Sequence, residues 1–374
     1  MSEHLGRASI RFDQPVYITE SASVVGKKEG EGPLGLLFDV VGDDDLFGGA
    51  SWEEAESSLQ KQAVGLVLEK AGLKAEDINL LFAGDLLGQS IASSFGLSVY
   101  QIPHFGLYGA CSTCGESLAL GAMAIAGNYA EKVVCVTSSH FASAEKEFRF
   151  PLDYGNQRPL SATWTVTGGG AFVLSGQMDR KQINKNNICY NNETTKMSEQ
   201  GKTQMSIQMS TPMSTGARGR ISGITVGIIT DFGLKDSMNM GACMAPASAS
   251  TLERHFIDFK SQPSDYDKII TGDLGSVGQK ILIDMMREKG YDISAQHMDC
   301  GIEIFDAESQ DTHSGGSGCG CSAVTLSAYI LKQLEEKNWK RVLFMPTGAL
   351  LSKTSFNEGK SVPAIAHALV LESC

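Results

Sequence analysis

The stretch YGACSTCGESLALGAMAIAGN, at residues 108–128, carries the residues with the clearest chemical potential in the chain. Cys111 lies where a loop leads into a run of Gly, Ala, Leu and Met, and this run predicts a buried helix over residues 118–125. The N-terminus of a helix presents unpaired N–H groups and partial positive charge, which stabilise a thiolate or a bound carboxylate. Cys111 is therefore a candidate nucleophile or pocket residue, although a free cysteine is often only a small buried hydrophobe.

Alternating helix and strand patterns surround this stretch. Residues 51–73 predict an amphipathic helix with Ser51 as its N-cap and Glu54 at the capping-box position. Buried strands are predicted at residues 78–85, 132–139 and 164–176. Strand–helix alternation of this kind favours an α/β fold with mainly parallel pairing inside it.

The chain also contains an internal duplication. FAGDLLGQSIASSFGL at residues 82–97 resembles ITGDLGSVGQKILIDM at residues 270–285, and in each an apolar strand leads through Gly-Asp-Leu into a helix. Downstream, a second similarity places Cys111 opposite Ser317. We predict two similar halves at residues 1–183 and 221–374, joined by an exposed connecting or cap segment at residues 184–220.

These motifs resemble the thiolase superfamily, and most of all its ketoacyl-synthase III-type condensing enzymes. GACS at residues 109–112 is similar to their nucleophile turn, TGGGAFVLS at 167–175 to a glycine-rich strand, and LFMPTGALLS at 343–352 to their last strand and turn. The resemblance spans nearly the whole chain. It implies a five-layer αβαβα fold of two duplicated halves, a pocket where the halves meet, and a dimer formed through the edge of the first-half sheet.

Two departures from these enzymes decide the functional interpretation. The resemblance places Gly272 of TGDLG where the enzymes have a catalytic histidine, and Ser317 of GSGCG where they have an asparagine. A cysteine without a base, and without groups that polarise a thioester carbonyl, should lose orders of magnitude in acyl-transfer rate. We therefore expect a non-catalytic protein with no cofactor and no bound metal.

Four stretches resemble one group of this fold more specifically, the stage V sporulation AD family of spore-forming bacteria. They are GDDDLFGGASWEEAES at 42–57, NMGACMAPASAST at 239–251, YDKIITGDLGSVGQKIL at 266–282 and MPTGALLS at 345–352. The resemblance implies a protein that binds dipicolinic acid, alone or with calcium. It also implies partnership with the membrane proteins of the stage V sporulation A complex, which moves calcium dipicolinate across the spore inner membrane in sporulation and germination.

Dipicolinate is a flat pyridine with two carboxylates, so backbone amides and cations suit it. Amides are expected from the glycine-rich turns at residues 272–275 and 315–318. His140, His313 and Arg149 are candidate cations, although an ordinary structural role fits each of them better. The predicted pocket residues are Cys111, Ser112, His140, Gly272, Asp273, Gly275, His313, Gly316 and Ser317.

Three alternatives stay open. His313 could replace the missing histidine as a base for Cys111, which would make the chain an acyltransferase. Cys111 and Cys114, with Cys319 and Cys321 from the corresponding turn, could bind zinc or act in redox chemistry, although Cys114 should lie inside a buried helix. The chain could also be a structural scaffold for the membrane complex without any ligand.

Composition and charge exclude several function classes. A net charge of −12, from 43 acidic and 31 basic residues, repels phosphate backbones and anionic lipid, so nucleic-acid binding is not expected. The sequence shows neither an apolar run of spanning length nor a secretory signal, and nine cysteines then favour reduced thiols. We expect a cytoplasmic protein held at the spore inner membrane through protein partners.

Overall fold

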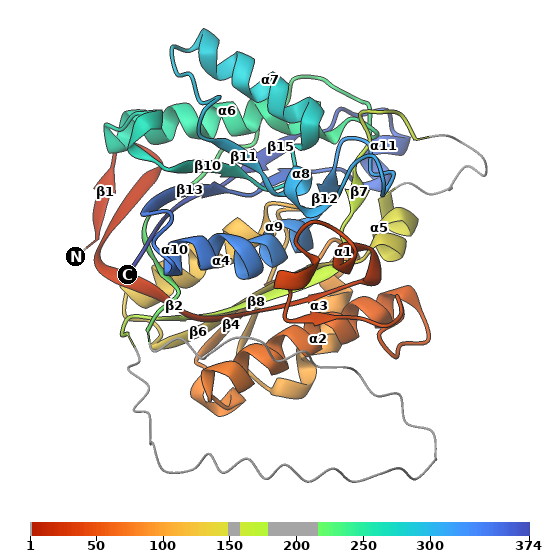
Figure 1. Cartoon of the computed structure of the whole chain (residues 1–374), viewed down its shortest axis with the longest axis vertical. Coiled ribbons are helices and arrows are strands. Elements are labelled where there is room, and N and C mark those ends of the chain that lie inside the picture. Colours follow the sequence, from red (N-terminus) through yellow and green to blue (C-terminus); the bar gives the residue numbers. More distant parts are fainter. Residues whose placement is uncertain (1, 149–157, 179–215) are drawn as a thin grey trace.

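The structure is a computed structural model of the chain, and it describes residues 2–148, 158–178 and 216–374. Figure 1 shows five layers, with helices on both outer faces, two sheet layers beneath them and helices in the middle. The outer helices are α6 (Met240–Phe259) and α7 (Gly275–Glu288) on one face, and α2 (Trp52–Ala71) and α3 (Ile91–Leu97) on the other. The middle helices are α4 (Thr113–Ala126), α9 (Cys319–Thr325) and α10 (Leu331–Glu335).

The strand order shows the duplication directly. The first half contributes β2 (Ser9–Val25), β4 (Leu80–Gly84), β5 (His104–Leu107), β6 (Lys132–Ser139) and β8 (Gly168–Ser175). The second half contributes β9 (Gly219–Thr225), β10 (Lys268–Thr271), β11 (His297–Asp299), β13 (Arg341–Met345) and β16 (Ala368–Glu372). The order β11-β10-β13-β16-β9-β2-β8-β6-β4-β5 reads the same way inward from either end, so each half repeats one topology. The predicted five-layer fold of two duplicated halves is confirmed.

The expectation of mainly parallel pairing is only half right. In each half the two outer pairings are parallel, β5-β4-β6 in the first and β11-β10-β13 in the second. The strands β8 and β16 are antiparallel to both of their neighbours. Both strands are buried and carry almost no charge. The residue pattern of such a strand does not reveal whether it pairs parallel or antiparallel with its neighbours.

The two halves meet at an antiparallel pairing between β2 and β9. The register of this pairing is interrupted between Arg11 and Val16, where residues 12–15 of β2 stand opposite Ser222 alone. Pro15 has no N–H to donate, which suits a position where the ladder of hydrogen bonds is broken. The β2–β9 pairing, which forms the seam between the halves, therefore continues on both sides of a bulge at residues 12–15.

Three apolar clusters fill the spaces between the layers. The central cluster, between the two sheets, includes Leu118, Phe172, Leu326 and Phe344. The outer clusters lie under α6 and α2 and include Met244, Leu252 and Phe256 on one side, and Leu59, Val67 and Leu81 on the other. Because α4 lies in the middle layer, it is apolar on almost every side, as its sequence predicts.

The predicted local elements are largely found. Ser51 caps α2 by accepting a hydrogen bond from the Glu54 N–H at 3.2 Å, and the Glu54 carboxylate accepts from the Ala50 N–H at 2.7 Å. The strand predicted at residues 164–176 is divided into β7 (Trp164–Thr165) and β8. Most of the connecting segment predicted at residues 184–220 lies outside the described residues, and β9 begins at Gly219.

A buried carboxyl in α1 (Lys27–Gly30) should make stability depend on pH. Glu29 accepts a hydrogen bond from the Thr167 N–H at 2.9 Å, and burial raises its pKa from 4.5 to about 7. Between these values the folded chain holds a proton that the unfolded chain has lost, so the free energy of unfolding falls as the pH rises. For this group alone the loss is about 3 kcal/mol, complete above pH 7.

Replacing Glu29 with glutamine should therefore flatten the pH profile. Urea denaturation at pH 5 and pH 8.5 is expected to show a stability loss that is smaller in Glu29→Gln than in the wild type by about 3 kcal/mol. Other buried acids make the free energy of unfolding depend on pH in both proteins. The difference between the two proteins therefore reports on Glu29 alone. Identical slopes would show that Glu29 is ionised in the folded chain throughout this range.

Candidate functional site

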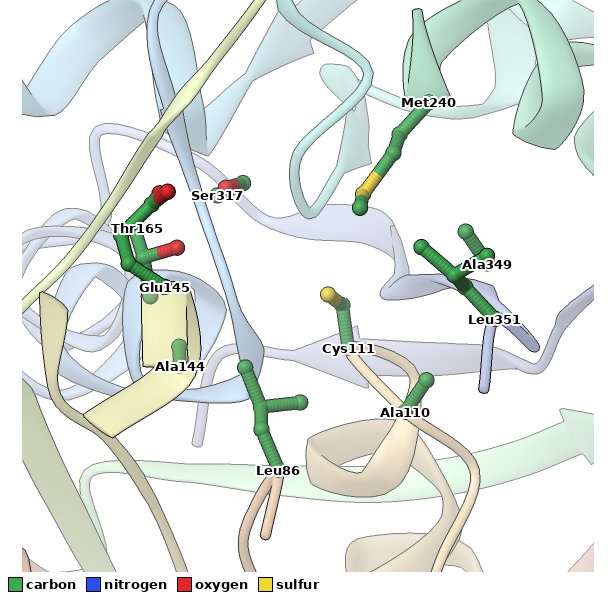
Figure 2. Close-up of a pocket in the computed structure, with 10 residues that line it drawn as sticks. All are labelled: Leu86, Ala110, Cys111, Ala144, Glu145, Thr165, Met240, Ser317, Ala349 and Leu351. Atoms are coloured by element: carbon green, nitrogen blue, oxygen red, sulfur yellow. The ribbon is translucent and has the colours of Figure 1, made fainter. Parts of the chain in front are cut away.

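A small pocket lies where the two halves meet, beyond the carboxyl ends of several strands. Figure 2 shows its ten lining residues. Leu86, Ala110, Cys111, Ala144, Glu145 and Thr165 come from the first half, and Met240, Ser317, Ala349 and Leu351 from the second. The free volume is about 20 Å³, which is room for about one water molecule. Apart from one thiol, two hydroxyls and the Glu145 carboxyl, the walls are apolar side chains.

A tight turn before α4 positions Cys111. Ala110 adopts a positive φ of 50°, a conformation that costs an L-residue energy, and Thr113 holds it by donating a hydrogen bond to the Ala110 carbonyl at 2.6 Å. Gly348 from the second half packs directly on the turn, where a Cβ would lie 2.2 Å from the Gly109 carbonyl oxygen. The helix begins at Thr113, so Cys111 precedes a buried helix as predicted.

Asp273 connects the Cys111 turn to two segments of the second half. It lies just after β10 and is almost completely buried. Its carboxyl accepts hydrogen bonds from the Thr347 hydroxyl at 2.6 Å and from the Gly318 N–H at 3.0 Å. The Cys111 thiol lies next to the same carboxyl, and the two groups shift each other's pKa. Asp273 was predicted to line the pocket; it is not among the lining residues, and instead it links the Cys111 turn to Gly318 and Thr347.

The protonation states follow from this burial. The pKa of Cys111 is raised well above its usual value, first by burial and then by the negative charge of Asp273. Burial also raises the pKa of Asp273 to about 7. A helix N-terminus by itself favours a thiolate, but burial and then the neighbouring carboxyl act in the opposite direction on Cys111. Both effects favour the protonated thiol at physiological pH.

The structure does not bring either predicted histidine to the pocket. His140 is buried, with Nε2 lying 2.7 Å from the Asp45 carbonyl oxygen. His313 has Nδ1 at 3.0 Å from the Pro159 carbonyl oxygen and Nε2 at 3.0 Å from the Asp311 carboxylate. Neither ring is positioned as a base for the thiol or as a cation for a ligand in this pocket. Arg149, the third candidate cation, lies outside the described residues.

Among the other predicted positions, only Ser317 lines the pocket. It forms β12 (Gly316–Ser317), which pairs with β7 and places Ser317 beside Thr165. The Ser112 hydroxyl instead donates to the Gly109 carbonyl at 2.7 Å. The backbones of Gly272 and Gly275 form hydrogen bonds outside the pocket. The Gly272 carbonyl accepts from the Cys321 thiol at 3.5 Å, and the Gly275 N–H donates to Asp299 at 3.0 Å.

The four cysteines of the metal interpretation do not form a common site. Cys319 donates to the Ser138 carbonyl at 2.9 Å, while Cys321 donates to a different carbonyl, that of Gly272. In the described part of the chain, no group of three or more His, Cys, Asp and Glu side chains is placed to hold a metal ion. The described cysteines are also free of disulfides. The zinc and redox alternatives gain no support from this arrangement.

The sequence analysis named only Cys111 and Ser317 among the ten lining residues, and the missed residues include Glu145 and Met240. Glu145 lies in α5 (Phe141–Phe148), directly after β6, and Met240 is the first residue of α6. Their positions after a buried strand and at a helix start were available as signals, because ligand sites in α/β folds gather at such places. What the sequence does not show is that Met240 extends toward the thiol while Glu145 lies beside Thr165 on the other side of the same pocket (Figure 2).

The chain closely matches one family over almost its full length. A family model described as Stage V sporulation protein AD (SpoVAD) matches residues 6–372. Stage V sporulation protein AD of Bacillus subtilis (strain 168) is 38% identical over 367 residues, which cover 98% of this chain and 97% of that protein. The chain belongs to the stage V sporulation protein AD family.

Solved structures show that this member of the stage V sporulation protein AD family has the thiolase fold. The 3-oxoacyl-[acyl-carrier-protein] synthase III of Aquifex aeolicus VF5 has 12% identity and a TM-score of 0.53, covering 96% of this chain and 99% of its own. Human mitochondrial 3-ketoacyl-CoA thiolase has 11% identity and a TM-score of 0.53, covering 96% and 98%. Within the described residues, no helix combines the length and apolarity needed to cross a membrane.

Proposed function

We propose that this sporulation protein binds dipicolinate in the Cys111 pocket and works without catalysis in the machinery that moves calcium dipicolinate in spores. The observation that carries the proposal is the pocket itself. It lies where the two thiolase-like halves meet and keeps a thiol, yet its described lining contains neither histidine nor asparagine. A thiol whose pKa is raised by burial and by the neighbouring Asp273 carboxyl, with no histidine in the described lining, suits a binding site better than an acyl-transfer site.

The charge of the pocket favours the calcium complex over the free dianion. Glu145 is the charged side chain among the described lining residues, and its carboxylate would repel a ligand with two carboxylates. Calcium neutralises dipicolinate and takes six to eight ligands, of which dipicolinate supplies only two carboxylate oxygens and the ring nitrogen. Glu145, Thr165 and Ser317 would then offer oxygen atoms to the remaining positions.

A ring-sized ligand needs more space than this structure leaves. The free volume of about 20 Å³ holds a single water, so two apolar side chains must turn aside. Met240 is suited to this because it is unbranched and adapts its shape readily, and its side chain extends toward Cys111 in Figure 2. Leu351 closes the same side of the pocket.

Calorimetric titration with dipicolinate, with and without calcium, tests this proposal. We expect binding to be at least tenfold tighter with calcium, and Glu145→Gln to lose most of that difference. Cys111→Ala should weaken binding about tenfold, since it removes a wall atom at the centre of the pocket, about 1.4 kcal/mol of contact energy. Cys243→Ala is the matched control, because Cys243 is equally buried but lies in α6 away from the pocket lining.

The titration and a companion measurement separate the possible outcomes. Absence of heat at millimolar ligand, or equal affinity in Cys111→Ala and the wild type, would remove this pocket as the dipicolinate site. The non-catalytic part of the proposal is tested by intact-protein mass after incubation with acyl-CoA. A stable acyl adduct on Cys111 would contradict it.

We further propose that the protein is a homodimer held at the spore inner membrane by the membrane proteins of its complex. The strand β5 is the outermost strand of the first half, and Phe105 on it is 55% exposed. Val99 and Phe95, just before this strand, are also exposed. An unpaired strand edge with apolar side chains is a surface that association covers. A monomer mass in sedimentation equilibrium at micromolar concentration would contradict the dimer.

A further inference from the structure

A second cavity lies at the bulge in the seam between the halves. Its volume is about 270 Å³, and it forms where residues 12–15 leave the pairing with β9. It lies at the opposite end of the sheet from the Cys111 pocket, because Arg341 at its wall begins β13, whereas Ala349 of the first pocket comes after that strand ends. The proposed dipicolinate site therefore does not account for this cavity.

Three guanidinium groups line this cavity. Arg341, Glu372 and Arg220 stand directly opposite one another on the adjacent strands β13, β16 and β9. Arg220 holds the Glu372 carboxylate at 2.9 and 3.0 Å, whereas Arg341 Nε lies 3.5 Å from it. Arg11 approaches from β2 and pairs with Glu3 at 3.2 Å, in a pair whose two side chains are about half exposed. Such an exposed pair contributes little and gives way readily.

Two of these groups are held in place by aromatic rings. The Arg11 guanidinium lies 5.5 Å from the centre of the Phe259 ring, and that of Arg341 lies 5.0 Å from the centre of the Tyr266 ring. Stacking of this kind fixes the plane of a guanidinium while leaving its N–H edge available. Arg341 Nε is buried and makes no hydrogen bond.

The cavity is less acidic than the protein as a whole. Its lining contains three arginines and two carboxylates, Asp13 and Glu372, and the exposed Glu3 beside Arg11 balances the third arginine, in a chain whose net charge is −12. Phe12, Pro15 and Phe259 provide apolar walls between the charged groups. Guanidinium groups form paired hydrogen bonds with carboxylates, and apolar walls favour a ligand with a hydrocarbon body over a bare inorganic anion.

We propose that this cavity is a binding site for a small organic dicarboxylate, with Arg11 binding one carboxylate and Arg341 with Arg220 binding the other. The site needs no backbone movement, since all three arginine side chains are between 36% and 49% exposed and face an existing hollow. It lies on both halves, so an occupied site would tie β2 of one half to β13 of the other.

Calorimetric titration of the full chain with isophthalate, a benzene ring with two carboxylates, tests the site. We expect submillimolar binding, at least tenfold weaker binding of benzoate and of inorganic phosphate, and at least tenfold weaker isophthalate binding in Arg11→Gln. Arg287→Gln is the control, because Arg287 is an equally exposed arginine in a surface ion pair on α7 and its loss changes the charge identically. It should leave the affinity unchanged.

Two further variants locate the binding. Cys111→Ala should not change the isophthalate affinity, and Arg341→Lys, which keeps the charge but loses the fork of N–H groups, should weaken it severalfold. The proposal is overturned if isophthalate shows no heat at millimolar concentration, if Arg11→Gln and Arg287→Gln bind alike, or if Cys111→Ala alone abolishes binding.

Discussion

Replacement of Asp273 by alanine should lower the free energy of unfolding by about 4 kcal/mol. The change leaves the Gly318 N–H and the Thr347 hydroxyl buried without an acceptor, and each unsatisfied buried donor costs about 1–3 kcal/mol. The Cys111 thiol loses its neighbouring carboxyl as well. Because these donors come from three separate segments, the loss spreads across the junction of the two halves. Urea denaturation at pH 6 measures it.

Two further variants sharpen this test. Asp273→Asn keeps one carbonyl oxygen as an acceptor and should lose about half as much stability. Asp292→Ala removes an exposed aspartate whose carboxylate accepts from the Ser294 N–H at 3.0 Å, and its loss should cost less than about 1 kcal/mol because water can replace it. Equal losses in Asp273→Ala and Asp292→Ala would show that Asp273 does not hold the junction.

Substitution of valine for Gly170 should destabilise the fold on the order of 4 kcal/mol, enough to remove much of its stability. Gly170 lies on β8 where the middle-layer helix α9 crosses it, and a Cβ there would lie 2.7 Å from the Ala323 backbone carbon. Backbone in a packed helix cannot shift as a side chain can, so the added volume strains both layers. This close approach explains why the last residue of the TGGG motif is a glycine.

A glycine in an open strand provides the matched control. At Gly106 in β5, an added Cβ would meet nothing within 4 Å, so Gly106→Val should change the free energy of unfolding by less than about 1 kcal/mol. Thermal denaturation of both variants, followed by far-UV circular dichroism, gives the comparison. If Gly170→Val melts within a few degrees of the wild type, α9 does not constrain β8 as the structure indicates.

Local features of this chain could be predicted from its sequence, whereas features that depend on distant contacts could not. The Ser51 cap was predictable because its partner lies three residues away. The duplication was predictable because each half repeats its own strand and turn pattern, and so the five layers followed from it. The positions of Cys111 before α4 and of Ser317 opposite it came from the same alignment.

The chemistry around the thiol was not predictable in the same way. The raised pKa of Cys111 depends first on burial in the assembled fold and then on Asp273, which is 162 positions further along the chain. His140 and His313 were candidate ligand-binding residues because His140 follows a predicted strand and His313 precedes a glycine-rich turn. Their rings nevertheless bond to Asp45, Pro159 and Asp311 through side-chain directions that no sequence pattern contains.

The two pairings that cross between the halves restrict how any molecule can reach the buried thiol. The antiparallel pairing of β2 with β9 joins the halves at one place, and the pairing of β7 with β12 joins them again beside the pocket, with backbone hydrogen bonds of 2.8 Å. A clamshell motion would have to break both sets of bonds together. A ligand must therefore enter by rotation of individual side chains such as Met240. The rate of ligand entry is then set by rotamer exchange while the backbone stays in place.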